Sequence, residues 1–485
     1  MGKVITIDPI TRLEGHGKIS IMLDDNGNVE RAFLQVPELR GFEAFSVGRR
    51  AEEMPQITSR ICGVCPTAHH MAGTKALDPL FDVIPTMTSK LIRELFYSLF
   101  MFEDHLIHFY FLGGPDFIVG PGAPAANRNI LGVIDKVGIE IGKKVIATRR
   151  RTRELMMQIG GKPIHPVLGL PGGVSKKISK ELQKDLISFS KEAIDFAQFT
   201  LKAFNEMVLQ NKAYLDLISS KIYYHETNYM GMVDKNNHVN FYDGKIRIVD
   251  PEGTELYKYD IKDYDKILAE HVEPWTYIKF PYLRELGWKG FIDGKESGLL
   301  RVAPLGRLNV ADGMATPLAQ SEYEKLYSML PKPCHHTLVN HWARLIEVLY
   351  AAERIEEISK IKELLSPEIR NMDLKIPKKG VGVVEAPRGT LIHHYETDDN
   401  GIITSANLLV ATLFNSAAMC MSIERVAKEI IKNGVVKEGL LNMVEMAFRA
   451  YDPCLSCATH SLPGKMPLEI SLYDRSKKLI RKISR

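Results

Sequence analysis

Four of the six cysteines form two Cys-x-x-Cys pairs that lie near opposite ends of the chain. The first pair is Cys62 and Cys65, and the second is Cys454 and Cys457. A Cys-x-x-Cys turn brings two thiolates within a few ångströms of each other, which suits metal chelation or a redox disulfide. A single site with four sulfur ligands therefore requires the two ends of the chain to meet in the fold.

Four thiolates alone are compatible with structural zinc, an iron–sulfur cluster or a dithiol redox switch. Zinc ribbons usually close over about 15 to 20 residues, whereas hundreds of residues separate these two pairs. Each pair also has a charged residue upstream, Arg60 or Asp452, and an imidazole downstream, His69 or His460. Such groups can donate to thiolates or carry protons, so the pattern indicates a reactive site. Soft sulfur ligands do not by themselves select nickel.

Residues 60–69 and 452–460 resemble the metal-binding signatures of the nickel–iron hydrogenase large subunit. Further motifs of that family occur in order between them, so the resemblance covers essentially the whole chain. They are Arg12-Leu-Glu14-Gly-His16-Gly17, Arg40-Gly-Phe-Glu43, Glu385-Ala-Pro-Arg388-Gly-Thr and Asn407-Leu-Leu-Val-Ala411-Thr412. The last match is looser, because many relatives have proline and serine where this chain has Ala411 and Thr412.

The resemblance implies a nickel–iron centre with one carbon monoxide and two cyanides on the iron. Cys62 and Cys454 would be terminal nickel ligands, while Cys65 and Cys457 would bridge nickel and iron. In the family, His69 would hydrogen-bond the Cys65 sulfur, and we expect Thr412 to donate to a cyanide. A second, hard cation, magnesium or iron, would be bound by three groups: Glu43, the backbone carbonyl of Leu408, and His460. A carboxylate, a carbonyl and an imidazole with waters suit an octahedral site of that kind.

The resemblance also implies reversible heterolytic cleavage of H2. Cys457 or Arg388 would accept the proton, Asp452 would orient Arg388, and Glu14 would be the first proton acceptor beyond the bridging cysteine. Burial raises a carboxyl pKa toward neutrality, which makes such a glutamate suitable for proton transfer. Splitting H2 into unlike fragments requires a Lewis acid and a nearby base.

Several of these residues also have a purely structural interpretation. Glu14 could form a salt bridge with Arg12, Arg388 could pair with Glu385, and Glu43 could be an exposed charge at the start of a helix. The histidine pairs 335–336 and 393–394, and the second histidine of the pair 69–70, are interpreted as core or surface groups. Adjacent residues on a helix or strand point apart and chelate poorly.

Electrons must leave through another chain, because the two remaining cysteines, Cys334 and Cys420, are isolated in sequence. The implied partners are heterodisulfide reductase, a small subunit with iron–sulfur clusters and a further electron-transfer subunit. These follow from a resemblance to the cytoplasmic multi-subunit branch, above all to the methyl-viologen-reducing, deazaflavin-non-reducing hydrogenases of methanogens. NAD(P)-linked and sulfur-reducing hydrogenases remain alternatives. So does a non-catalytic chain with a structural zinc site, whereas the homologous respiratory complex I subunit lacks the four cysteines.

Composition is that of an ordinary globular protein, with 485 residues, 45% hydrophobic and 25% charged. The net charge of +4 is spread along the chain and does not indicate nucleic-acid binding. The most apolar stretch, residues 91–112, is interrupted by charged residues and predicts a buried helix without a transmembrane segment. The scarcity of cysteine fits a reducing compartment, and no export signal is visible, so we expect a cytoplasmic protein.

The pattern of apolar residues predicts a mainly α fold, and the resemblance implies a helical core like that of the nickel–iron hydrogenase large subunit. An antiparallel β region is expected within residues 1–40, and a β-rich insertion within residues 225–300. Apolar spacing predicts helices at about 43–58, 87–112, 177–223, 335–366, 404–432 and 438–450. Because the cysteine pairs must meet, residues 1–460 should form one intertwined catalytic unit. Residues 461–485 resemble an extension that a maturation protease removes, and a retained extension would alter the metal role of His460.

Overall fold

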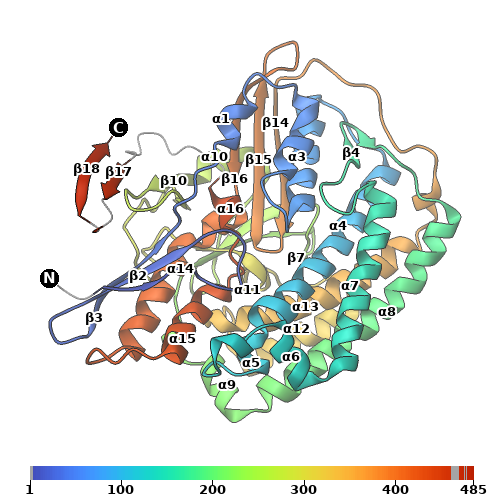
Figure 1. The fold of residues 1–485 in the computed structure, drawn as a ribbon. Coiled ribbons are helices and arrows are strands. Elements are labelled where there is room, and N and C mark those ends of the chain that lie inside the picture. Colours follow the sequence, from blue (N-terminus) through green and yellow to red (C-terminus); the bar gives the residue numbers. More distant parts are fainter. Residues whose placement is uncertain (1–3, 460–468, 474–475, 477, 485) are drawn as a thin grey trace.

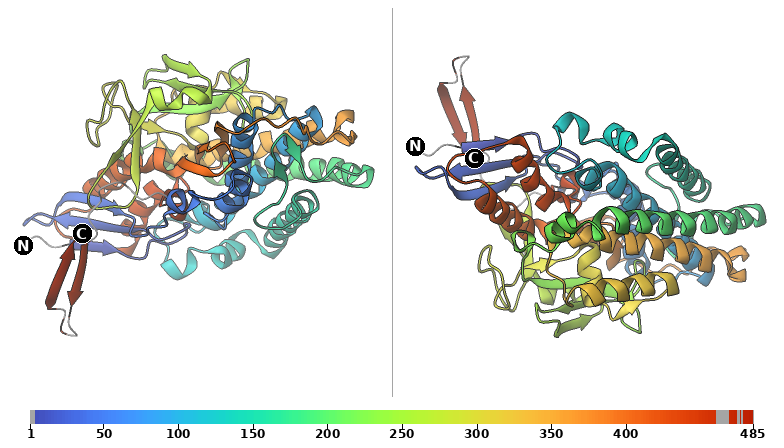
Figure 2. Two further views of the ribbon diagram at one scale, coloured as in Figure 1. Left: turned by 90° about the horizontal axis from the view of Figure 1, so that it is seen from above. Right: turned by 90° about the horizontal axis from the view of Figure 1, so that it is seen from below.

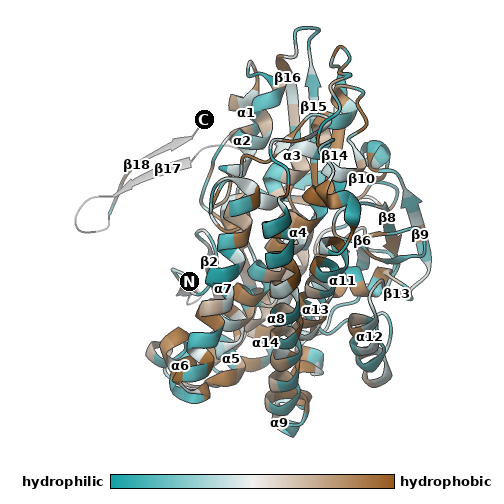
Figure 3. Ribbon diagram, turned by 90° about the vertical axis from the view of Figure 1, so that its right-hand side faces the viewer, coloured by the Kyte–Doolittle hydropathy of each residue, from teal (hydrophilic) through white to brown (hydrophobic). Residues whose placement is uncertain are grey.

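The computed structural model describes residues 4–459, 469–473, 476 and 478–484. A bundle of long helices forms the largest part of the molecule (Figure 1). Its members are α4 (Met87–Ile107), α7 (Ile139–Gly160), α8 (Lys180–Phe204) and α13 (Asn340–Ser359). Helix α13 packs against both α4 and α8 and is buried along most of its length, as expected for a helix that is covered on several sides. Teal and brown residues alternate along α7 and α8 in Figure 3, which marks them as amphipathic.

Hydroxyl caps begin two of these helices. The Thr86 side chain accepts a hydrogen bond from Ser89 N at the start of α4, and Ser179 accepts one from Leu182 N at the start of α8. Each cap satisfies one of the backbone N–H groups that a first helical turn leaves without an intrahelical partner. The predicted helix over 87–112 is confirmed as α4, which continues into a π-helical turn at His108–Gly113. The region 177–223, predicted as one or two long helices, contains α8 with a π-helical turn at Asn205–Leu209, followed by the separate short helix α9 (Lys212–Ile218).

The first cysteine pair lies in the short loop between α2 (Met54–Ser59) and α3 (Pro66–Leu80). Pro66 occupies the first turn of α3, where a missing N–H has no cost. The predicted helix over 43–58 is instead two short helices, α1 (Phe42–Ser46) and α2, separated by a 3₁₀ turn at Ala51–Glu53.

An antiparallel sheet that the sequence analysis did not predict packs on α3. It consists of β14 (Lys379–Ala386), β15 (Gly389–Thr397) and β16 (Ile403–Leu409). The prediction of a helix from residue 404 was therefore wrong at its start. Residues 403–409 are strand β16, and helix α14 (Ala411–Ile430) begins only after it. The apolar run across 408–414 belongs to both elements, because both are buried, so periodicity could not separate them.

The two ends of the chain meet beside this sheet. The N-terminal antiparallel sheet has strands β1 (Val4–Ile7), β2 (Lys18–Leu23) and β3 (Val29–Gln35), and β3 packs against α14. After α15 (Glu438–Arg449), the second cysteine pair lies at the start of the one-turn helix α16 (Leu455–Ala458). A parallel β-bridge joins Glu14 to Cys454.

The β-rich insertion is confirmed. Its main sheet has the order β13-β7-β6-β8-β9, with β12 paired to β6, and a hairpin β10–β11 lies beside it. Its strands are β6 (Asn228–Val233), β7 (His238–Val239), β8 (Lys245–Val249), β9 (Glu255–Tyr259), β10 (Leu268–Val272), β11 (Lys279–Leu283), β12 (Leu300–Arg301) and β13 (Gly313–Met314). Strands β12 and β13 extend the insertion beyond the predicted limit of residue 300.

Short elements complete the fold. The helices are α5 (Pro115–Ile118), α6 (Ile130–Val137), α9 (Lys212–Ile218), α10 (Tyr264–Ile267), α11 (Ala303–Val310) and α12 (Pro317–Met329). The strands are β4 (Gly169–Leu170), β5 (Gly173–Val174), β17 (Glu469–Tyr473) and β18 (Leu479–Ser484). The hairpin β17–β18 lies at the same end of the molecule as the N-terminal sheet in both views of Figure 2. Within the described residues, every helix is too short or too polar to span a bilayer.

Candidate metal centre

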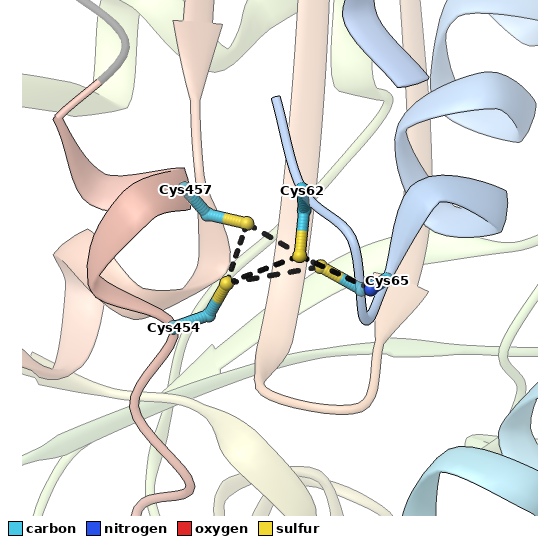
Figure 4. A group of neighbouring side chains, drawn as sticks. All are labelled: Cys62, Cys65, Cys454 and Cys457. Atoms are coloured by element: carbon cyan, nitrogen blue, oxygen red, sulfur yellow. Dashed lines mark hydrogen bonds between the residues drawn. The ribbon is translucent and has the colours of Figure 1, made fainter. Parts of the chain in front are cut away.

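The four paired cysteines converge in one buried cluster (Figure 4). Their Sγ atoms all lie within 4.8 Å of one another. Cys62 Sγ is 3.4 Å from Cys454 Sγ, and Cys65 Sγ is 3.3 Å from Cys457 Sγ. Both of these distances join a cysteine of the first pair to one of the second, while Cys454 Sγ and Cys457 Sγ lie 2.7 Å apart within the second pair. The cluster therefore brings together residues from opposite ends of the chain.

Local backbone geometry aims the first pair into the cluster. The loop after α2 turns so that Val64 N and Cys65 N donate to Cys62 Sγ, at 3.2 and 3.1 Å. Backbone donors of this kind favour the thiolate over the thiol. In the second pair, Asp452 adopts a left-handed backbone conformation with φ of 55°, which turns the chain immediately before Cys454.

The electrostatics of the cluster fit a bound cation. Burial raises the pKa values of Cys454 and Cys457 well above that of an ordinary thiol. Burial also opposes ionisation of Cys62, but hydrogen bonds from the other three cysteines and the charge of Arg388 hold its pKa well below the usual value. One thiolate is thus stabilised by the protein alone, and a soft dication coordinated by all four sulfurs would let the others ionise.

A small cavity adjoins the sulfurs on one side. It is lined by Cys65, Ala68, His69, Ala386, Arg388, Leu391, Val410, Ala411, Thr412, Cys454 and Cys457. Most of this lining is apolar, and its polar groups are the candidates named from sequence. The Thr412 hydroxyl oxygen accepts a hydrogen bond from Cys454 N at 3.2 Å. The polar groups of the lining, Arg388 and Thr412 among them, could face a second metal bound by the same sulfurs.

Glu14 contacts the cluster through the second cysteine pair. Its Oε2 accepts from Cys454 Sγ at 2.9 Å and from Ser456 N at 3.2 Å. Burial, and then the negative charge of Cys62, raise the pKa of Glu14. The expectation that Glu14 serves the bridging cysteine Cys457 needs correction, since the sulfur that it contacts is that of Cys454. The predicted alternative, a salt bridge with Arg12, is also wrong, because Arg12 pairs with Asp116 at 2.6 Å.

Arg388 occupies the tight turn between β14 and β15 and is held by two buried carboxylates. Its Nε donates to the backbone oxygen of Asp452 at 2.8 Å, and its Nη2 lies 3.2 Å from Asp452 Oδ1 and 3.3 Å from Asp104 Oδ1. Asp452 therefore orients Arg388 as expected. The alternative pairing with Glu385 is wrong, since Glu385 instead binds Arg307 at 2.9 Å.

His69 faces a different sulfur from the one expected. Its Nε2 lies 3.4 Å from Cys457 Sγ, where the resemblance had suggested Cys65. Its Nδ1 lies 3.2 Å from His393 Nε2, and His393 Nδ1 lies 2.6 Å from the Tyr395 hydroxyl. A buried polar chain thus runs outward from Cys457 through three rings.

The proposed hard-cation ligands are only partly within the described residues. Glu43 Oε1 accepts a hydrogen bond from Leu408 N at 2.7 Å, which brings this carboxylate to the backbone of β16. Arg40 N donates to Thr459 O at 2.9 Å, so the described end of the second cysteine segment lies against the same motif. His460 lies outside the described residues.

Sequence reasoning missed two residues of this site, Asp104 and His393. The signal for Asp104 was present, because Glu103-Asp104-His105 interrupts an otherwise apolar helix and such charges must find buried partners. His393 was assigned to the core as one of an adjacent pair. The two histidines of that pair have different partners. His394 hydrogen-bonds the Tyr264 hydroxyl, whereas His393 hydrogen-bonds His69. His70 is a core group as expected, with Nε2 accepting from Gly169 N at 2.8 Å.

Two family models match this chain, and together they cover more than half of its residues. A model described as "Nickel-dependent hydrogenase" matches residues 40–128 and 298–460. A second model, described as "HoxL-like", matches residues 4–39. All four cysteines, Glu43 and Arg388 fall within the first match, and Glu14 falls within the second.

Individual proteins are similar over nearly the full length. An F420-non-reducing hydrogenase iron-sulfur subunit of Archaeoglobus profundus is 47% identical, covering 99% of both chains. A subunit of the F420-non-reducing hydrogenase of Methanothermobacter marburgensis is 41% identical, again with 99% coverage of each. The crystal structure of an NAD+-reducing [NiFe]-hydrogenase in the H2-reduced state has a chain that superposes with a TM-score of 0.88. That chain is 38% identical, with 94% of this chain and 99% of the other covered.

Proposed function

Because this chain belongs to the nickel-dependent hydrogenase family, as its catalytic large subunit, and is hence an oxidoreductase, we propose that it cleaves H2 reversibly at the four-cysteine cluster. The observation that carries the proposal is the convergence of the four cysteines, with Arg388 lining the adjoining cavity and Glu14 in contact with Cys454.

Each residue of the site has a distinct part in the proposed reaction. A nickel–iron pair held by the four thiolates, with carbon monoxide and two cyanides on the iron, would supply the Lewis acid and the redox change. Arg388 orients and polarises H2 in the cavity, held in place by Asp452 and Asp104. The contact of 2.9 Å favours Cys454, in place of Cys457, as the sulfur that exchanges a proton with Glu14. Thr412 would donate to a cyanide, and His69 would fix the position of the Cys457 sulfur.

The second metal site is proposed from two ligands that the structure describes and one, His460, that lies outside the described residues. Glu43, the Leu408 carbonyl and His460 would bind magnesium or iron, and the approach of Glu43 to Leu408 supports this set. Residues 461–485 would be removed by a maturation protease, leaving His460 at the end of the chain. Protonation of the ligands would compete with the metal, so occupancy of this site should fall at low pH.

Electron transfer is assigned to partner chains. Beyond the four paired cysteines the chain has only Cys334 and Cys420, both buried, and two thiolates are too few for the four-cysteine ligation of an iron–sulfur cluster. A small subunit with such clusters and a further electron-transfer subunit would carry electrons to heterodisulfide reductase. Identities of 47% and 41% to F420-non-reducing hydrogenases favour this acceptor over NAD(P), although an NAD+-reducing enzyme is similar at 38%. Free buried cysteines favour a cytoplasmic location.

Metal analysis of the complex purified without oxygen tests the proposal, together with infrared spectroscopy and the intact mass of this chain. We expect about one nickel per chain, infrared bands of iron-bound carbon monoxide and cyanide, and a chain that ends at His460. Zinc without nickel in a cleaved chain would replace the catalytic assignment with a structural one. Zinc without nickel in a full-length chain would identify an immature precursor.

A further inference from the structure

Helix α7 exposes a line of apolar and cationic side chains on its outer face. With about 3.6 residues per turn, positions four, seven, eleven and eighteen residues apart return to nearly the same side of a helix. Five exposed residues of α7 have that spacing: Ile139, Lys143, Ile146, Arg150 and Met157. The three apolar members are 63%, 47% and 45% exposed. We call these five residues the α7 stripe, which at a rise of about 1.5 Å per residue extends about 27 Å.

The rest of α7 holds the helix on the bundle. Its main apolar side is buried, and it packs against α4, α6 and α8. Arg149 Nε and Arg153 Nε both donate to the buried Glu103 Oε1, at 3.0 and 2.8 Å. Arg151 pairs with a carboxylate of α8, so these three arginines are used inside the fold. The Arg150 side chain, in the same run, forms no hydrogen bond or ion pair with the described part of the chain.

The charge of α7 indicates the chemistry of a partner. The helix carries six cationic and two acidic side chains, a surplus of four positive charges that equals the formal net charge of the whole chain. Lys143 of the α7 stripe pairs with Glu140 at 2.9 Å, but this pair is exposed and such pairs are worth little in water. Lys143 and Arg150 are therefore available to carboxylates of another molecule that approaches from solvent.

An acidic protein surface fits the α7 stripe better than two other candidate occupants. A second copy of this chain in a two-fold contact would place the same cations opposite each other, which is unfavourable. An anionic membrane binds helices with a broad apolar face, whereas the broad apolar face of α7 is already buried. Protein interfaces commonly combine an apolar centre with polar groups at the rim, and this combination matches the stripe.

The position of α7 favours a partner particular to one branch of the family. Neither family model covers residues 129–297, since one matches 4–39 and the other 40–128 and 298–460. The F420-non-reducing relatives, in contrast, are similar along nearly the whole chain. In both views of Figure 2, the teal helices α6 and α7 lie at the edge of the molecule. The stripe is thus open to a further subunit.

We propose that the α7 stripe binds another protein subunit, through a surface of that subunit with carboxylates around an apolar centre. Lys143 and Arg150 form ion pairs with those carboxylates, and the three apolar residues of the stripe are buried against the centre. The inference goes beyond the proposed function and does not depend on the reaction at the cysteine cluster.

The test is carbodiimide cross-linking of the hydrogenase complex, purified through a tag on this chain. A carbodiimide joins a lysine amine directly to a carboxylate, without a spacer. We expect Lys143 of the wild type to be joined to an aspartate or glutamate of another subunit, with both peptides identified by mass spectrometry. The variant that combines Ile146→Asp with Arg150→Glu should lower the cross-link and the amount of that subunit that co-purifies at least tenfold, because it places like charges opposite each other.

Met329→Asp combined with Lys191→Glu is the matched control. Met329 is 45% exposed at the end of α12, against 47% for Ile146, and Lys191 is an exposed cation on α8. The same subunit should co-purify with this control as with the wild type. Thermal unfolding of both combined variants should match the wild type, which separates a lost contact from a lost fold. Replacing the cross-linked carboxylate of the partner by lysine should restore binding to the chain with Arg150→Glu.

Several results would overturn the proposal. One is a wild-type complex in which Lys143 is joined to no other subunit, and another is undiminished co-purification with the variant of Ile146 and Arg150. A cross-link from Lys143 to a second copy of this chain would make the stripe a contact between copies. Binding of the wild type, and not of the variant, to vesicles of phosphatidylcholine and phosphatidylglycerol in equal parts would assign it to a lipid surface. None of these results bears on H2 cleavage at the cysteines.

Discussion

At the scale of single residues, the site is defined by which charge pairs with which. Arg388 could have paired with Glu385, three residues away in sequence. In the structure, Glu385 forms its ion pair with Arg307. Arg388 instead forms ion pairs with Asp104 and Asp452. All of these groups are nearly or fully buried. Separating a buried ion pair costs about 3 to 5 kcal/mol, so the observed pairing of arginines with carboxylates is strongly favoured. It leaves the guanidinium directed over the cavity beside the sulfurs.

Replacing Arg388 by lysine should lower H2 oxidation at least tenfold while nickel content stays near one per chain. A lysine ammonium cannot reproduce the planar fork that bonds two carboxylates at once. The measurements are H2-dependent dye reduction and metal analysis of the same preparation. Arg31→Lys is the control, because Arg31 is exposed on strand β3. Full activity in Arg388→Lys would show that positive charge alone is sufficient.

Glu14→Gln should slow D2/H2O exchange by about 100-fold or more, within the range for a positioned acid–base group. Glutamine retains the size of Glu14 and an oxygen for Ser456 N, so infrared bands of the iron ligands should stay in place. Glu14→Asp should recover part of the rate. An exchange rate equal to that of the wild type would mean that protons leave the cluster by a path that bypasses Glu14.

At the scale of elements, turns and close backbone contacts decide whether the two cysteine segments meet. Gly15 and Gly389 both have positive φ and both lie against another segment, Ser456 and Val302 respectively. A side chain at either position would push apart elements that the site needs together. Helix α5 is similarly joined to α15, because Asp116 binds both Arg12 and Arg449 at 2.6 Å.

Gly15→Ala should reduce nickel incorporation, whereas Gly48→Ala should not. Both glycines have nearly the same positive φ, +84° and +86°, so the backbone strain is matched. Only Gly15 has a neighbour in the way, since nothing lies within 4 Å of a Cβ at Gly48. Nickel per chain in the purified complex checks the prediction. Equal losses in both variants would attribute the effect to strain and not to the contact with Ser456.

Asp116→Asn should destabilise the protein by about 3 to 5 kcal/mol, because it leaves two buried guanidinium groups short of a partner. Burial opposes ionisation of Asp116, but Arg449 and Arg12 hold its pKa below the usual value. Its contribution is therefore fully present above the unfolded-state pKa of about 3.9 and is lost as pH falls through the lower native pKa. Thermal unfolding across acidic pH should show a weaker pH dependence for Asp116→Asn than for the wild type.

At the scale of the whole molecule, the metal centre is a cross-link between the chain ends. Cys62 and Cys454 are 392 positions apart in sequence and 3.4 Å apart in space. A metal bound by all four sulfurs would hold these segments together and would be lost on unfolding, so its binding would contribute directly to stability.

Metal-free protein should therefore unfold at a lower temperature than the loaded enzyme, and the loss should be greatest around the two cysteine segments. Hydrogen exchange read by mass spectrometry, compared between the two forms, should show faster exchange in residues 60–69 and 450–459 without metal. Helix α8, which packs against α13 and α7, serves as the internal control. Uniformly faster exchange would mean that the metal stabilises the entire fold cooperatively.

The sequence by itself determined the chemistry of the site and most of its parts. Spacing identified the four cysteines as one candidate site with Asp452 beside it, and the resemblance to the nickel–iron hydrogenase large subunit identified Glu14 and Arg388. Periodicity predicted the long helices and the β-rich insertion, since an amphipathic or apolar pattern reflects local burial. Strands β14 and β15 were missed because they are buried on both faces over most of their length, and such strands show no alternation.

Only the tertiary structure decided which partner each group meets. Glu14 contacts Cys454 and not Cys457, His69 faces Cys457 and not Cys65, and Asp104 joins Arg388 from a distant helix. These choices depend on distances of an ångström or two between segments hundreds of residues apart. Spacing along the chain contains no information about such distances, which are set by how the helices and the sheet pack against one another.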